Sequence, residues 1–127
     1  MANLQQVHSN NAPQAIGPYS QAIKTGNLVF LSGQIPLDPE TMELVAGDVA
    51  AQTHQVFANL TAVAEAAGCS LANAVKLTIY VIDLGDFATV NEIMAGYFSE
   101  PYPARATIQV SALPKGSMVE IDAVLSL

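Results

Sequence analysis

The sequence predicts an α+β fold in which a single mixed β-sheet carries two helices on one of its faces. Two segments have apolar residues at helical spacing, and they alternate with five segments that have the composition of strands. Each helix crosses from one strand to another, so both should pack on one face of the sheet. The length of 127 residues fits one domain, which we expect to span residues 1–127.

The first two strands are expected at residues 19–24 and 28–31, joined by a turn around Gly26. The second strand is uniformly apolar and leads into Ser32-Gly33, which favours a buried strand that is closed by a turn. Residues 36–47 then form a polar connection.

Asp48 is a suitable N-cap for the first helix, whose apolar pattern continues until Gly68 ends it. Residues 74–82 are β-branched and apolar on both faces, as in a central strand that is covered on both sides. Asp86 can cap the second helix, and Pro101 prevents it from continuing. The apolar residues that share a face of this second helix are Phe87, Val90, Met94, Tyr97 and Phe98.

Residues 104–111 and 118–125 are expected to form the last two strands. Because both helices lie on one face, the opposite face of the sheet should be bare. Apolar residues make up 51% of the chain and charged ones only 12%, about half of the usual charged share. A bare sheet face that is buried against identical subunits explains this deficit, so we expect an obligate oligomer.

The composition also excludes two classes of partner. The net charge is −7 with only four unclustered basic residues, so we expect no binding to nucleic acid. No apolar run approaches the roughly 20 residues of a membrane-spanning helix, so we expect no membrane. The first residues show neither a secretory signal nor a transit peptide, and the single cysteine, Cys69, suits a reducing compartment. A cytoplasmic location is therefore expected.

Arg105 is the only arginine, and it lies within a strand of small and apolar residues. Alternate residues of a strand share a face of the sheet. With the apolar set of each strand facing the helices, Arg105 and Glu120 are predicted to lie together on the bare face. A guanidinium there needs an anion, which is either the carboxylate of a bound small acid or a neighbouring side chain. The residues alone leave open a purely structural ion pair with Glu120 or Asp122.

Several motifs resemble those of the Rid (YjgF) family of enamine/imine deaminases, in order and over nearly the whole chain. They are Ala15-Ile16-Gly17-Pro18-Tyr19-Ser20-Gln21-Ala22, Leu31-Ser32-Gly33-Gln34-Ile35-Pro36, Asp86-Phe87-Ala88-Thr89-Val90-Asn91, Tyr102-Pro103-Ala104-Arg105-Ala106, Leu113-Pro114-Lys115 and Val119-Glu120-Ile121. The resemblance implies a chorismate-mutase-like fold and a homotrimer. It also implies clefts between subunits that bind small 2-imino or 2-keto acids.

By this resemblance Arg105 clamps the substrate carboxylate, helped by the backbone amide of Gly33, and Glu120 positions or activates water. The resemblance also assigns Tyr19 to the catalytic set. The remaining residues that shape the pocket would be Ser32, Phe87, Asn91 and Thr107. Many relatives carry cysteine where this chain has Thr107, so the resemblance leaves the substrate range open.

The implied activity is that of a 2-iminobutanoate/2-iminopropanoate deaminase, which forms 2-keto acids and ammonia. The reaction requires no cofactor, and the sequence offers no cluster of metal ligands. Two alternatives remain: a binding or regulatory protein for small 2-keto acids, which the same arginine would serve, and RNA cleavage, which the acidic charge disfavours. His8, His54 and Cys69 are interpreted as structural or surface residues, whereas Tyr19 and Asn91 could also be ordinary fold residues.

Overall fold

The computed structural model describes residues 3–127, and within them six strands and two α-helices alternate. The strands are β1 (Gln5–Val7), β2 (Ala22–Thr25), β3 (Leu28–Gln34), β4 (Ala74–Val81), β5 (Ala104–Gln109) and β6 (Val119–Ser126). The helices are α1 (Val49–Ala66) and α2 (Phe87–Ala95), together with the short 3-10 helices η1 (Leu71–Asn73), η2 (Leu84–Asp86) and η3 (Pro114–Gly116). Only β1 among the strands was not expected from the sequence. No helix of this part of the chain is long and apolar enough to cross a membrane.

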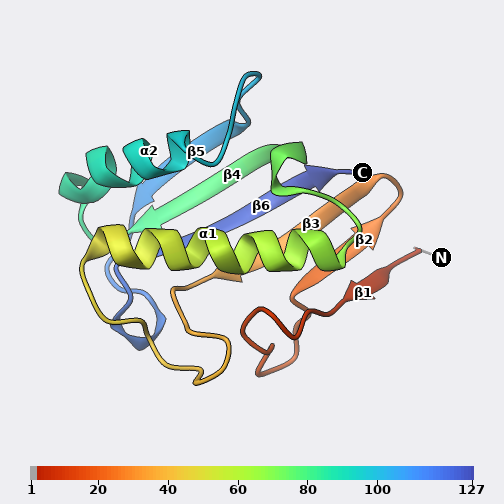
Figure 1. The fold of residues 1–127 in the computed structure, drawn as a ribbon, viewed down its shortest axis with the longest axis horizontal. Coiled ribbons are helices and arrows are strands. Elements are labelled where there is room, and N and C mark those ends of the chain that lie inside the picture. Colours follow the sequence, from red (N-terminus) through yellow and green to blue (C-terminus); the bar gives the residue numbers. More distant parts are fainter. Residues whose placement is uncertain (1–2) are drawn as a thin grey trace.

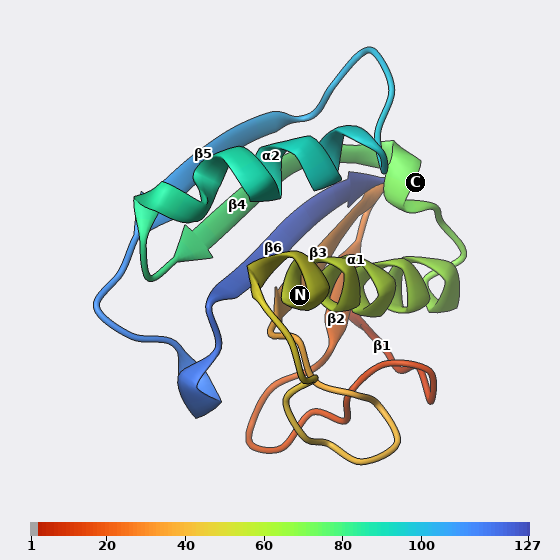
Figure 2. The ribbon, with the colours of Figure 1, turned by 60° about the vertical axis from the view of Figure 1, so that its left-hand side comes forward.

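The strands form one sheet in the order β1-β2-β3-β6-β4-β5. β4 and β5 run parallel and every other neighbouring pair is antiparallel, so the sheet is mixed. Figures 1 and 2 show α1 and α2 side by side on one face, with the other face uncovered. The predicted α+β fold, with a mixed sheet and both helices on one face, is confirmed.

Local sequence signals account for most of the helix ends. The Asp48 carboxylate accepts a hydrogen bond from the Ala51 amide at 3.1 Å, and Gly68 adopts a left-handed φ of +76° after α1. The prediction for α2 was wrong in two details, because Asp86 makes no side-chain cap and the helix ends at Ala95. Asp83 instead accepts from the amide of Gly85 and caps η2, which leads directly into α2.

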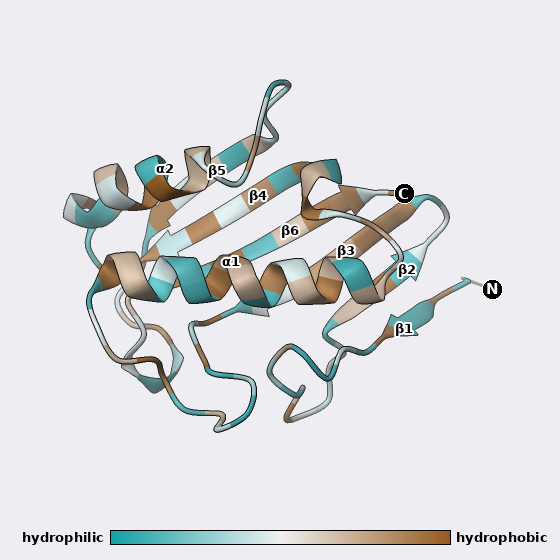
Figure 3. Ribbon diagram, viewed as in Figure 1, coloured by the Kyte–Doolittle hydropathy of each residue, from teal (hydrophilic) through white to brown (hydrophobic). Residues whose placement is uncertain are grey.

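The hydrophobic core lies between α1 and the central strands. Figure 3 shows hydrophobic residues recurring along β3, β4, β6 and α1. Fully buried side chains of α1 form one cluster with those of β4 and β6. They are Val56, Phe57, Leu60 and Val63 on the helix, and Leu77, Ile79, Val81, Val119, Ile121 and Leu125 on the strands. This core fixes which face of each strand is turned toward the helices.

The strand register shows that Arg105 and Glu120 lie on opposite faces of the sheet. Arg105 pairs with Leu77 of the core, so it lies on the helix-covered face. Glu120 pairs with Tyr80, which lies on the uncovered face together with Ile108. The prediction that Arg105 and Glu120 share a face was therefore wrong. The apolar residues of β5 face away from the helices, and Ile108 remains 45% exposed there.

Candidate functional site

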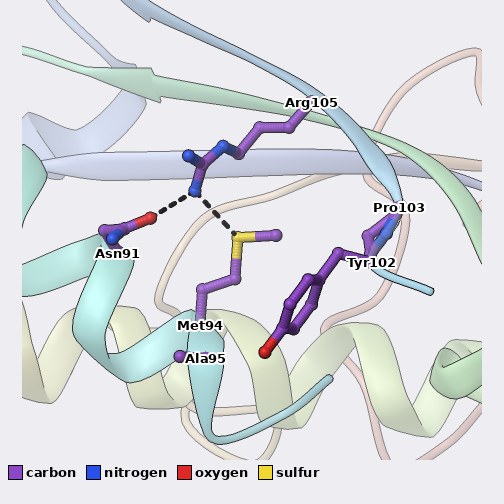
Figure 4. A pocket seen from close by; sticks show the side chains of 6 residues that line it. All are labelled: Asn91, Met94, Ala95, Tyr102, Pro103 and Arg105. Carbon is purple, nitrogen blue, oxygen red and sulfur yellow. Dashed lines mark hydrogen bonds between the residues drawn. The ribbon is translucent and has the colours of Figure 1, made fainter. Parts of the chain in front are cut away.

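Arg105 lines a pocket between β5 and α2, which we call the arginine pocket. Its volume is about 350 Å³. The residues that line it are Asn91, Met94, Ala95, Tyr102, Pro103 and Arg105. Figure 4 shows the guanidinium group reaching from the strand toward Asn91 and Met94 on the helix. A cation is thus presented in a cleft large enough for a small organic acid.

The groups that hold Arg105 are all neutral. Its Nη1 atom donates to Oδ1 of Asn91 and contacts Sδ of Met94 at 3.7 Å. Its Cζ atom lies 5.3 Å from the centre of the Phe87 ring, in a cation–π arrangement. These contacts orient the guanidinium but leave its charge without a carboxylate partner within the described subunit. Two predicted pocket residues, Phe87 and Asn91, are therefore brought to Arg105.

Thr107 follows Arg105 on the same face of β5, opposite Ile79 of the core. Within residues 3–127 its Oγ1 atom is buried without a hydrogen-bond partner. A buried hydroxyl group without a partner is costly, so a group that supplies one hydrogen bond would be favoured at this position. Thr107 therefore lies on the same face of β5 as the arginine, with an unsatisfied polar atom.

Glu120 belongs to a second group of predicted residues, around a β-bulge in β3. The pairing of β3 with β6 is interrupted after Leu31 and resumes at Gln34. Two residues of β3, Ser32 and Gly33, therefore lie opposite a single residue of β6. The Glu120 carboxylate lies directly against Gly33, where a Cβ atom would overlap with it. A residue with a side chain at this position would force the Glu120 carboxylate to move.

The environment of Glu120 favours its neutral form. Partial burial raises the pKa of Glu120 above the ordinary value of 4.5, and the nearby charge of Asp122 raises it further. Asp122 accepts a hydrogen bond from Oη of Tyr80 at 3.1 Å. Burial, followed by this hydrogen bond and the two carboxylates, raises the pKa of Tyr80 as well. A carboxyl group with a raised pKa is a stronger base than an ordinary carboxylate, which makes Glu120 a candidate for proton transfer.

A second pocket, the bulge pocket, opens beside Gly33 with a volume of about 270 Å³. The residues that line it are Pro13, Gln14, Ile16, Tyr19, Gln21, Gly33, Gln34, Ile35, Leu37, Met42, Pro114 and Lys115. Tyr19 lies in the loop before β2 and is 53% exposed, so its expected place in a strand was wrong. The Ser32 hydroxyl donates to the Ser20 carbonyl at 2.6 Å and holds that loop against β3.

The predicted site residues thus form two separate groups. Arg105, Phe87, Asn91 and Thr107 lie on the helix-covered side of β5 and beside α2. The second group, around the bulge, is Tyr19, Ser32, Gly33 and Glu120.

Sequence reasoning missed Met94, Tyr102 and Met42 as pocket residues. Tyr102 precedes Pro103 in the arginine motif and could have been found there. Nothing in the sequence signals the position of Met42.

The residues interpreted as structural lie outside both pockets. His54 shares a hydrogen bond of 2.8 Å between its Nδ1 atom and Oη of Tyr97. The Cys69 thiol donates to the Ser126 carbonyl at 3.3 Å. The described residues contain no group of three His, Cys, Asp or Glu side chains that could hold a metal ion.

Comparisons with known proteins agree with the motifs. The family model described as Endoribonuclease L-PSP matches residues 9–126. Protein DfrA of Myxococcus xanthus is 59% identical over 93% of this chain and 92% of its own length. The human protein named 2-iminobutanoate/2-iminopropanoate deaminase is 48% identical over 93% of this chain and 86% of its own length.

A solved structure shows the same fold. The crystal structure of RidA from the Antarctic bacterium Psychrobacter sp. PAMC 21119 has a TM-score of 0.93 and 53% sequence identity, and the match covers 97% of this chain and 99% of that one. The ordered motifs, the six-stranded sheet and these matches lead to one assignment. The chain belongs to the Rid (YjgF) family, which the matching family model describes as Endoribonuclease L-PSP.

Proposed function

We propose that the protein hydrolyses reactive 2-imino and enamine acids to 2-keto acids and ammonia. The observation that carries this proposal is a pair of groups. In one pocket lies a guanidinium that only neutral side chains hold, and against Gly33, which lines the other pocket, lies a glutamate with a raised pKa. The first group suits a carboxylate and the second suits an attacking water molecule. The human relative bears the name of this activity.

The two groups complete one site only when two subunits meet. Arg105 and Glu120 point to opposite faces of the sheet, and β4 separates their strands. The uncovered face carries exposed apolar side chains such as Phe30 and Ile108, which an identical subunit would bury. We therefore propose a homotrimer of chorismate-mutase-like architecture, with three clefts between adjacent subunits. Arg105 comes from one side of each cleft and Glu120 from the other.

The proposed reaction starts with the substrate carboxylate on Arg105, whose planar fork can donate two parallel hydrogen bonds. The amide of Gly33, in the interrupted part of the ladder, supplies a further donor. Glu120 removes a proton from water as the oxygen adds to C2 and the C=N bond becomes a single bond. The proton then passes from Glu120 to nitrogen, which gives a tetrahedral carbinolamine. As its C2–N bond breaks, the hydroxyl proton moves to the leaving nitrogen, so that ammonia departs and the C=O bond of the 2-keto acid forms. No step in this scheme requires a metal or an organic cofactor.

RNA cleavage, the activity in the name of the family model, fits this chain less well. Only four basic residues stand against eleven acidic ones, and they form no stripe that could follow a phosphate backbone. A protein that only binds 2-keto acids would need the arginine pocket but not a carboxyl group against Gly33. We therefore favour the deaminase, acting in the cytoplasm on imines that dehydratases release.

A coupled assay tests the proposed activity. A pyridoxal-phosphate-dependent threonine dehydratase releases 2-iminobutanoate from threonine, and semicarbazide traps the imine that has not been hydrolysed. Adding the protein should accelerate the formation of 2-ketobutyrate and reduce the trapped fraction, whereas adding Arg105→Ala should change neither. If the wild-type protein leaves both quantities unchanged, it is a binding protein and not a deaminase.

A further inference from the structure

Both non-glycine residues with a left-handed backbone among residues 3–127 line the bulge pocket. Met42 has a φ of 61° and Lys115 a φ of 58°. A residue with a Cβ atom is strained in this region, and such residues cluster at binding and catalytic sites. Their shared position indicates that this pocket is built for a ligand.

A turn with several internal hydrogen bonds holds the backbone of Met42 in its left-handed conformation. The Asp38 carboxylate accepts from the amides of Glu40 at 2.8 Å and Thr41 at 3.3 Å. The Met42 amide donates to the Asp38 carbonyl at 2.8 Å, and the Asp38 amide donates to the Glu43 carbonyl at 2.9 Å. These bonds fix the backbone on both sides of Met42. The turn therefore presents the thioether side chain at the pocket in a defined way.

Buried amide side chains hold two walls of the same pocket. Nδ2 of Asn59 on α1 donates to the carbonyls of Ile35 at 3.2 Å and Leu37 at 3.0 Å. Nε2 of Gln21 donates to the Pro13 carbonyl at 2.7 Å. Both side chains are almost completely buried, so these segments are anchored to the core. The bulge pocket is thus formed before any ligand binds.

The chemistry of the pocket suits an apolar group that begins near Glu120. Gly33 both lines the pocket and contacts the Glu120 carboxylate. Most of the other wall is apolar, and its apolar members are Pro13, Ile16, Ile35, Leu37, Met42 and Pro114. An imino acid whose C2 atom lies at Glu120 would therefore have an apolar space beside it.

Resting on the proposed function, we propose that the bulge pocket receives the side chain of the imino acid and that Met42 sets the preference for long apolar side chains. The unbranched, polarisable thioether adapts to apolar groups of different shape. A branched four-carbon side chain would fill more of this space of about 270 Å³ than a methyl group, and would therefore gain more from the apolar contact that Met42 offers. Met42 is thus a specificity-determining residue that takes no part in the chemical step.

Three variants separate the side chain of Met42 from its backbone. Met42→Gly and Met42→Asn both suit a left-handed backbone and both remove the apolar contact. Met42→Leu keeps the apolar volume. Each protein is assayed on two imino acids, 2-iminopropanoate and the imino acid of leucine. An amino-acid oxidase generates the first from alanine and the second from leucine, in the presence of catalase. Thermal unfolding of every variant verifies that it folds.

We expect Met42→Gly and Met42→Asn to lower kcat/KM for the leucine imine about tenfold, through KM, as for the loss of about one methylene contact. The loss for 2-iminopropanoate should be much smaller, and Met42→Leu should keep the preference of the wild type. Equal effects on both imines, or no effect on either, would overturn the assignment of the pocket while leaving the deaminase intact. If the wild type hydrolyses 2-iminopropanoate but not the leucine imine, the assignment of the pocket is also overturned and the deaminase activity remains. Inactivity of the wild type on both imines would overturn the proposed function, and the pocket assignment with it.

Discussion

Arg105 and Glu120 stand on opposite faces of one sheet, Arg105 opposite the buried Leu77 and Glu120 opposite Tyr80 on the uncovered face. A substrate on Arg105 is therefore out of reach of Glu120 in the same subunit. The neighbours of the guanidinium are the neutral side chains of Asn91, Met94 and Phe87. If both residues act on one molecule, the oligomer is part of the active site.

Arg105→Ala should lower kcat/KM for 2-iminobutanoate by roughly 30-fold or more, because truncating a charge-assisted pair costs about 2–5 kcal/mol. Arg105→Lys should recover little, since an ammonium group cannot form the planar fork. Lys24→Ala removes the same charge from β2 and serves as the control. Steady-state kinetics and sedimentation measure both effects. If Arg105→Ala instead dissociates the oligomer, Arg105 forms an interfacial ion pair.

Glu120→Gln keeps the size of the side chain but removes the base. We expect turnover to fall roughly 100-fold, within the usual contribution of a general base, while 2-ketobutyrate still binds. Turnover, calorimetric affinity for 2-ketobutyrate and thermal stability are measured on the same variant. Unchanged turnover would remove Glu120 from the mechanism, and a change in stability alone would make it a structural residue.

The raised pKa of Glu120 predicts opposite pH trends for activity and stability. Burial first, and the charge of Asp122 second, raise this pKa above 4.5 in the folded protein. Turnover needs the carboxylate, so it should fall as the pH drops through the raised pKa. The folded state holds the proton more tightly than the unfolded chain, so this contribution to stability is present below pH 4.5 and is lost as the pH rises through the raised pKa. Glu120→Gln should remove both trends, and their persistence would assign them to another group.

Gly33→Ala should reduce turnover without unfolding the protein. Gly33 does not have a left-handed backbone, but its new Cβ atom would overlap with the Glu120 carboxylate and displace it. Gly96→Ala is the matched control, because its Cβ atom would lie 3.4 Å from the nearest atom, the Ile93 carbonyl oxygen. Circular dichroism verifies the fold, and the coupled assay measures turnover. Full activity of Gly33→Ala would show that the carboxylate position is unimportant.

Much of the fold could be predicted because its signals are local. The Asp48 cap, the left-handed Gly68 and the doubly apolar segment at residues 74–82 each define an element without knowledge of its neighbours. β1 was not predicted because its three residues, two of them glutamine, show no apolar pattern. Its pairing with β2 makes it a strand.

The arrangement of the site could not be predicted in the same way. Alternation along β5 places Arg105 and Ile108 on opposite faces of the sheet. Only the pairing of β5 with β4 decides which of these two faces is turned toward the helices. The more apolar set faces the uncovered side, where another subunit and not a helix would bury it. The strained backbone of Met42 depends on bonds to Asp38 and is equally invisible in the residue pattern.

The central claim is that Arg105 and Glu120 of different subunits form one site, and mixed oligomers test it most directly. Arg105→Ala and Glu120→Gln subunits carrying different tags are unfolded together, refolded and isolated as oligomers that contain both. If each cleft takes Arg105 from one subunit and Glu120 from the next, every cyclic trimer that contains both variants restores one of its three clefts, or about one third. We predict that the mixture recovers about this fraction of wild-type turnover, although each parent is inactive. Mixed oligomers that form but remain as inactive as their parents would contradict the shared site.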